Sequence, residues 1–175
     1  MRLERGAEHK HEYFDGAIQP VHESGYAHNL ICANLTILHG QLSGKNGTAV
    51  GSSQRLQIMS GQAFTYPALA VVCGNPEFRA AEETDTLLNP TLLIEVTYAS
   101  TTSYDYVDKF MLYRQVPSLQ QYLMIDSTTV YAELYTRDEL NRWVLTETRD
   151  PAAVLDLGSI GCAVPLAEVY AGVGF

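Results

Sequence analysis

Two apolar segments constrain the fold of this chain more than any other feature of its sequence. They are ALAVVCG at 68–74 and TLLIEV at 91–96. Short apolar segments without regular polar alternation are typical of strands that are buried on both faces of a sheet. Such strands need a covering layer on each side, so we expect a layered α/β domain.

Helical and extended patterns alternate along the rest of the chain. Apolar residues at helical spacing predict helices over 27–42, 104–116 and 165–172. Further strands are expected at 12–18, with a turn at Asp15-Gly16, and at 54–59, 121–126, 130–136 and 142–148. The segment 42–53 is expected to be a loop. This order of elements predicts an α/β fold in which a mixed β-sheet is flanked by helices.

The composition favours one globular domain without a broad basic surface. The chain has 175 residues and a net charge of −9, and we expect a polar tail over 1–10 and a single domain over 11–175. Proteins that bind nucleic acid over a broad surface usually present positive charge. No apolar segment reaches the roughly 18 residues of a membrane span, so we expect no membrane partner. Three scattered cysteines are typical of thiols in the cytoplasm, which is the predicted location.

Glu95 is the most informative polar residue. It is the only charged residue in the segment 91–96, and a buried carboxylate without a partner is costly. It either belongs to a site with a metal or cation, or lies on a solvated edge strand, or pairs with Lys109 for structural reasons. Lys109 follows on a predicted helix, where both a role at a site and a plain surface position are open to it.

The segment DTLLNPTLLIEVTYASTTSYDYVDKFMLYRQVPSLQQYLMID at 85–126 resembles a large bacterial family named for restriction endonucleases. This family, formerly a domain of unknown function, belongs to the PD-(D/E)XK nuclease superfamily. HEYFDGAI at 11–18 and SIGCAVPLAEVYAGV at 159–173 resemble the same family, so the resemblance extends over 11–173. It implies a restriction-endonuclease-like core, in agreement with the predicted order of elements.

The resemblance also implies a set of site residues. The family combines an aspartate at one strand, a glutamate in the next strand and a lysine on the following helix. By position these are Ala68, Glu95 and Lys109, and Glu12 matches a recurrent acidic position. In an active member, Mg²⁺ or Mn²⁺ bound at Glu95 would assist hydrolysis of DNA. Ala68 has replaced the aspartate, and its methyl group cannot bind a metal.

Two interpretations of the activity follow from this replacement. The protein is a weakly active or inactive member of an endonuclease family, in agreement with its negative charge, which argues against DNA as a partner. Alternatively, it is an active metal-dependent endonuclease that uses Glu95, Lys109 and a substitute carboxylate, either Glu12 or Asp85. Edge strands and the hairpin expected at 130–148 are compatible with a homodimer.

Overall fold

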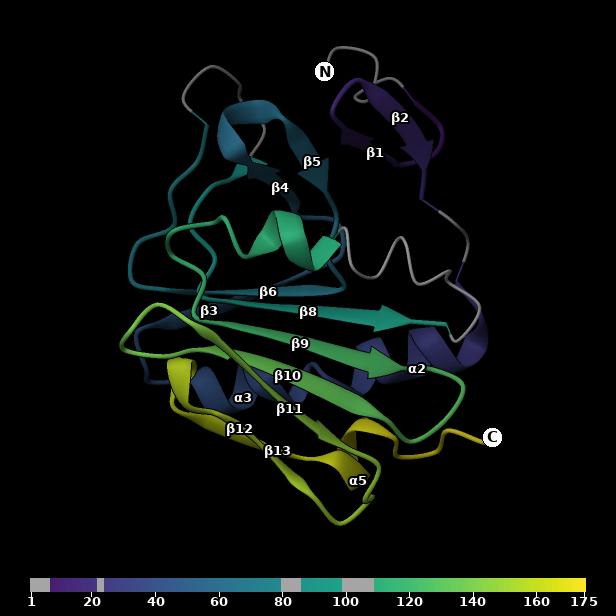
Figure 1. Cartoon of the computed structure of the whole chain (residues 1–175). Coiled ribbons are helices and arrows are strands. Elements are labelled where there is room, and N and C mark those ends of the chain that lie inside the picture. The colour runs from purple at the N-terminus through teal and green to yellow at the C-terminus, as the bar shows by residue number, and fades with distance from the viewer. Residues whose placement is uncertain (1–6, 22–23, 80–85, 99–108) are drawn as a thin grey trace.

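A six-stranded mixed β-sheet lies across the middle of the molecule (Figure 1). The computed structural model describes residues 7–21, 24–79, 86–98 and 109–175. In order across the sheet, the strands are β11 (Trp143–Thr148), β10 (Ala132–Arg137), β9 (Gln121–Asp126), β8 (Leu92–Thr97), β6 (Leu69–Cys73) and β3 (Gly47–Gly51). β8 and β9 run parallel, whereas all other neighbouring strands are antiparallel. The predicted mixed α/β architecture is therefore confirmed.

A second sheet of five strands lies above the first in Figure 1. Its order is β2 (Ala17–Pro20), β1 (His11–Phe14), β5 (Ala63–Thr65), β4 (Arg55–Ile58) and β7 (Thr86–Leu87). Asp15 and Gly16 join β1 to β2 with positive φ angles of 41° and 94°, the conformation that tight two-residue hairpins favour. This hairpin places Glu12 on a strand that borders β5.

The helix predicted over 27–42 is divided in the structure. α2 (Tyr26–Asn34) and α3 (Ile37–Leu42) are separated by a turn in which the N–H of Thr36 bonds to the carbonyl of Ala33. The hydroxyl of Thr36 donates to the same carbonyl at 2.6 Å, a local bond that competes with regular helix. The predicted apolar stripe is buried across both pieces, at Ile31, Leu35, Leu38 and Leu42.

The two faces of the six-stranded sheet contact two different cores. The first core lies on the side of α2, α3 and α5 (Leu166–Val169) and includes Ile94 and Leu123. The second core lies between the six-stranded sheet, the five-stranded sheet and a helical segment at 109–113, and includes Leu93 and Tyr122. Burial on both faces explains why 68–74 and 91–96 are apolar.

Five strands were not predicted from the sequence. They are β3, β5, β7, β12 (Val154–Leu157) and β13 (Cys162–Pro165), of which the last two form a separate two-stranded sheet. The prediction of a loop over 42–53 is wrong where β3 forms. A short segment with glycine at both ends pairs there with the apolar strand β6. A Cβ atom at Gly47 would lie 2.8 Å from the Leu42 side chain, so glycine permits this close packing of α3.

Some predicted elements extend beyond the described residues. The helix expected over 104–116 is seen as helix at 109–113, and residues 104–108 lie outside the described part. Residues 1–6 of the predicted tail also lie outside it. Within the described ranges, no helix is long and apolar enough to cross a membrane.

We expect the centre of the first core to dominate stability. Leu123 in β9 is fully buried, and Leu123→Ala should lower the free energy of unfolding by about 2–5 kcal/mol because it leaves a cavity. Leu140 is 71% exposed, and Leu140→Ala should change it by less than about 0.5 kcal/mol. Urea denaturation followed by circular dichroism measures both values, and equal losses would contradict this assignment of the core.

Candidate functional site

Glu95 lies on β8 with its side chain turned away from the first core. Its neighbours Ile94 and Val96 belong to that core, and Leu93 belongs to the second core. Side chains alternate along a strand, so Glu95 shares the side of Leu93. Glu95 is 7% exposed, and a carboxylate at this depth requires polar partners.

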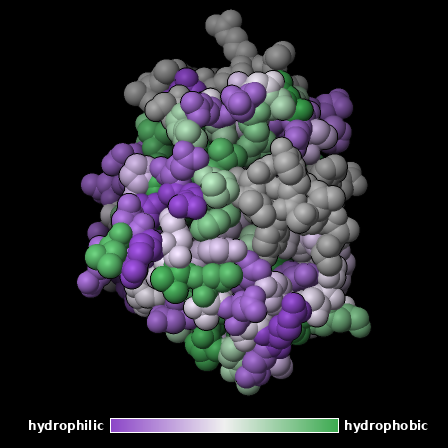
Figure 2. Space-filling model, in the orientation of Figure 1, coloured by the Kyte–Doolittle hydropathy of each residue, from purple (hydrophilic) through white to green (hydrophobic). Residues whose placement is uncertain are grey.

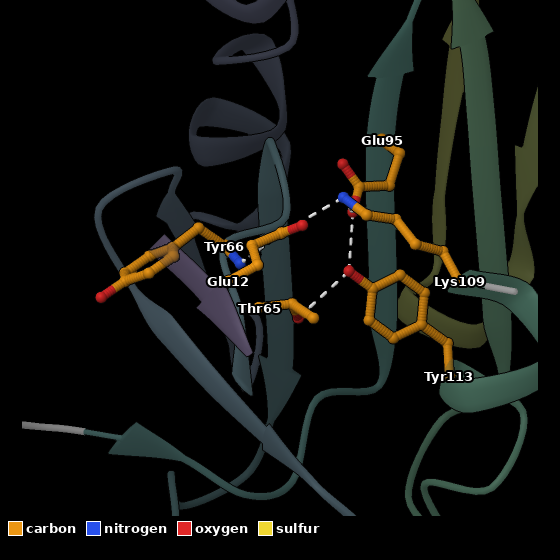
Figure 3. A network of polar contacts seen from close by, with 6 residues as sticks. All are labelled: Glu12, Thr65, Tyr66, Glu95, Lys109 and Tyr113. Carbon is orange, nitrogen blue, oxygen red and sulfur yellow. Dashed lines mark hydrogen bonds and ion pairs between the residues drawn. The ribbon is translucent and has the colours of Figure 1, made fainter. Parts of the chain in front are cut away.

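The ammonium group of Lys109 is the main partner of Glu95. Its Nζ lies 3.3 Å from Oε1 of Glu95 and 3.2 Å from Oε1 of Glu12. Figure 3 shows the ammonium between the two carboxylates. The side chains are 27% exposed for Lys109, 13% for Glu12 and 9% for Glu95, so the group lies near the surface without being freely solvated. Glu12 comes from the five-stranded sheet and Glu95 from the six-stranded sheet, so Lys109 links the two sheets.

Tyr113 completes the arrangement from the same helical segment. It follows Lys109 by one helical turn, a spacing that places both side chains on one face. Its hydroxyl donates to Oε1 of Glu95 at 2.7 Å and lies 3.1 Å from the hydroxyl of Thr65 on β5. Because a phenol has one hydrogen, Thr65 acts as the donor in the second bond. We call Glu12, Glu95, Lys109 and Tyr113 the site cluster.

Glu12 is held by the backbone as well as by Lys109. The N–H of Tyr66 donates to Oε1 of Glu12 at 3.2 Å. Tyr66 directly follows β5, which pairs with β1 through Tyr13 and Phe64. The hairpin predicted from Asp15-Gly16 thus brings Glu12 to the end of β5, where the aromatic ring of Tyr66 points away from the site cluster (Figure 3).

Burial and charge both affect the pKa values of the site cluster. Burial raises the pKa of Glu12, the ammonium of Lys109 opposes this, and the nearby carboxylate of Glu95 raises it further. Burial alone would lower the pKa of Lys109, but Glu95 and Glu12 together hold it above its ordinary value. The pKa of Tyr113 lies well above its usual range. Burial is the largest cause, and the charge of Glu95 is the next. Lys109 is therefore a cation and Tyr113 a neutral hydrogen-bond donor at neutral pH.

Ala68 lies immediately before β6. β6 and β8 pair with Leu69 opposite Ile94, and the same register extended by one residue brings Ala68 beside Glu95. Ala68 is partly buried and packs against the first core. This packing does not direct its Cβ toward Glu95, so the prediction that both side chains face one cleft stays a prediction.

The sequence identified three members of the site cluster and missed the fourth. Glu95 and Lys109 were candidates from their positions in the sequence and from the resemblance, and Glu12 was a candidate from the resemblance. The structure brings their charged groups together. Tyr113 was not predicted, although its position four residues after Lys109 was a usable signal. Asp85, the other candidate for a substitute carboxylate, lies outside the described residues.

The site cluster offers few ligands for a metal ion. Within the described ranges, no group of three or more His, Cys, Asp or Glu side chains is placed to hold one. Glu12 and Glu95 supply hard carboxylate oxygens close enough to share one ammonium group. Mg²⁺ is often held by one or two carboxylates together with water and substrate phosphates. These residues therefore fit a minimal Mg²⁺ or Mn²⁺ site, at which Lys109 competes for the same oxygens.

Comparison with known proteins assigns the family. Residues 1–164 match the Uma2 family, described as "Putative restriction endonuclease". The chain belongs to this family. The match covers every residue of the site cluster as well as Ala68, so the family assignment and the geometry concern the same part of the chain.

Individual relatives agree with this assignment. Two uncharacterized proteins of Synechocystis sp., slr1290 and sll1609, are 32% and 30% identical to this chain. The first match covers 100% of this chain and 90% of the relative, and the second covers 84% and 83%. A crystal structure of a "putative nuclease belonging to DUF820" from Anabaena variabilis has a TM-score of 0.74 at 14% identity. It covers 94% of this chain and 91% of its own, which establishes a shared fold.

We expect the Tyr113 hydroxyl to be important for stability. Tyr113→Phe removes the bonds to Glu95 and Thr65. It leaves the buried hydroxyl of Thr65 without this partner and Glu95 with Lys109 alone, at a cost of about 1–3 kcal/mol. Tyr26 is 81% exposed, so Tyr26→Phe is a matched control that should leave stability unchanged. Urea denaturation of both variants tests this, and an unaltered midpoint for Tyr113→Phe would rule out the proposed bonding.

Proposed function

We propose that this protein belongs to a family of Mg²⁺-dependent DNA endonucleases, and that its own cleavage activity is weak or lost. One observation carries the proposal. The ammonium group of Lys109 contacts both acidic side chains of the site cluster, and the position of a third carboxylate is Ala68. Two carboxylates and one ammonium group give the site a formal charge of −1. A site with so little net charge attracts a divalent cation poorly.

The proposed domain spans 11–175 and has a restriction-endonuclease-like core. The order of elements in the sequence and the fold shared with the Anabaena protein support this assignment. DNA is the partner that the family name suggests. The net charge of −9 lowers the expected affinity for a polyanion, in agreement with a member that cleaves poorly.

An active endonuclease is the second candidate function, and Glu12 favours it. In this alternative, Glu12 takes the place of the missing aspartate beside Glu95, and both would hold the metal ion. A bound Mg²⁺ activates water and stabilises negative charge on a phosphodiester. Lys109, released from one carboxylate, would hold its proton near the developing charge, and Tyr113 would orient Glu95.

Calorimetry with Mg²⁺ and Mn²⁺ separates the two candidates. With the native chain, we expect weak or undetectable heat, because Lys109 occupies one oxygen of each carboxylate. Tight stoichiometric binding that disappears in both Glu12→Gln and Glu95→Gln would instead establish Glu12 as the substitute ligand. If the active alternative is right, a plasmid-nicking assay should show metal-dependent cleavage by the native chain and none by Glu12→Gln or Glu95→Gln.

Ala68→Asp should restore metal binding. A third carboxylate changes the formal charge of the cluster from −1 to −2, so the variant should melt at a lower temperature than the native chain without metal. Added Mn²⁺ should then raise its melting temperature more than that of the native chain, because the metal binds only the folded state. Ala68→Asn has a similar shape without the charge and serves as the control. An equal response to Mn²⁺ in both variants would show that residue 68 is not the missing ligand position.

A further inference from the structure

β11 forms one edge of the six-stranded sheet. It pairs with β10 over six residues, from Trp143 opposite Arg137 to Thr148 opposite Ala132. Within the described part of the chain, no strand pairs with its outer side. A strand in this position presents a row of backbone donors and acceptors that can pair with another chain.

The opposite edge of the same sheet, β3, is partly covered by α3. α3 packs on β3, and the ring of His39 bonds to the carbonyl of Ala49 on that strand at 2.9 Å. Glycines stand at both ends of β3, at Gly47 and Gly51. A side chain thus satisfies part of the β3 edge, whereas no described side chain bonds to the outer backbone of β11.

Apolar side chains are exposed on both faces of β11. Leu145 is 46% exposed on the side of Tyr135, and Val144 is 50% exposed on the side of Thr136. Figure 2 shows apolar patches within the polar surface in the lower half of this view, where Figure 1 places β10 and β11. The strand WVLTET contains no lysine or proline, the residues that commonly protect an edge from pairing.

We infer that β11 pairs with β11 of a second copy of this chain, antiparallel and across a two-fold axis. This inference is independent of the proposed function. The two-fold axis must pass midway between the two copies of one residue. Opposed residues in an antiparallel pair point to the same face of the sheet, so a residue cannot lie opposite its own neighbour in sequence. The axis that keeps most of the strand paired passes near its centre, at Leu145 or Thr146.

Apolar contact and charge favour the axis at Leu145. There Leu145 lies opposite its own copy, and Trp143 of each chain lies opposite Glu147 of the other. Over 141–149, this register opposes no two like charges. An axis at Thr146 would instead place Leu145 against the carboxylate of Glu147. The interface consists of one short strand from each chain, so we expect a weak dimer whose population rises with protein concentration.

Disulfide trapping tests the register in the full chain. Cys73 is exposed, so both variants are made in a Cys73→Ser background. Under mild oxidation, Leu145→Cys should form a covalent dimer rapidly, because its two copies lie opposite each other within disulfide range. Val144→Cys points to the other face and is opposed by Thr146, so it should cross-link at least tenfold more slowly. Equal or reversed rates would overturn the register.

Sedimentation velocity over a concentration series tests the interface itself. Native protein should show a concentration-dependent dimer, and Leu145→Lys should abolish it because two ammonium groups would face each other. Ile18 is 63% exposed on β2, an edge strand of the other sheet, and Ile18→Lys is the matched control. A native chain that is monomeric at all concentrations, or a dimer lost only in Ile18→Lys, would overturn the proposal.

Discussion

The ammonium group of Lys109 is the charge on which the arrangement of the two sheets around the site depends. It contacts Glu12 from the five-stranded sheet and Glu95 from the six-stranded sheet, at 3.2 and 3.3 Å. A partly buried carboxylate without a cation is unfavourable, so the contact with Lys109 offsets the cost of placing both side chains at this depth. The hydroxyl of Tyr113 adds a neutral link across the same seam, between Glu95 and Thr65.

The same contacts define the chemistry that the site can support. Oxygens that accept from an ammonium group and a phenol are less available to a metal ion, unless the ion displaces Lys109. An aspartate at position 68 would make such displacement more favourable, because the added charge could not be balanced by one lysine. With alanine at position 68, the two carboxylates of the site cluster contact one ammonium group, and the formal charge of the cluster stays low. The alanine at position 68 and the ion pairs are two parts of one electrostatic explanation for the weak metal binding that we propose.

The six-stranded sheet connects the site to the rest of the molecule. β8 carries Glu95 near the centre of this sheet, three strands away from β11 in the order β11-β10-β9-β8. An interface at β11 would extend the sheet at this edge. Trp143 on β11 contacts Phe110, which directly follows Lys109 in the chain, so the β11 edge and the helical segment of the site share a packing contact.

The sequence by itself determined the layered α/β class, the two buried strands and three of the four residues in the site cluster. These depend on local patterns, namely apolar segments, helical spacing and motifs that recur in a family. It did not reveal β3, β5, β7, β12 or β13, because short strands with small or mixed side chains are stabilised by the strands they pair with. The break between α2 and α3 was also missed, since the Thr36 hydroxyl bond acts against an otherwise continuous apolar stripe.

Only the tertiary structure decided the partners of each charge. Glu12 and Lys109 are far apart in the chain, and their contact requires the β1–β2 hairpin to dock beside β5 and the helical segment at 109–113 to pack between the sheets. Tyr113 joined the site for the same reason, because its hydroxyl meets Glu95 and Thr65 only when both sheets are in place. Residue types can indicate which groups are able to react. Their ionisation and their availability depend on distances and burial, which no local pattern contains.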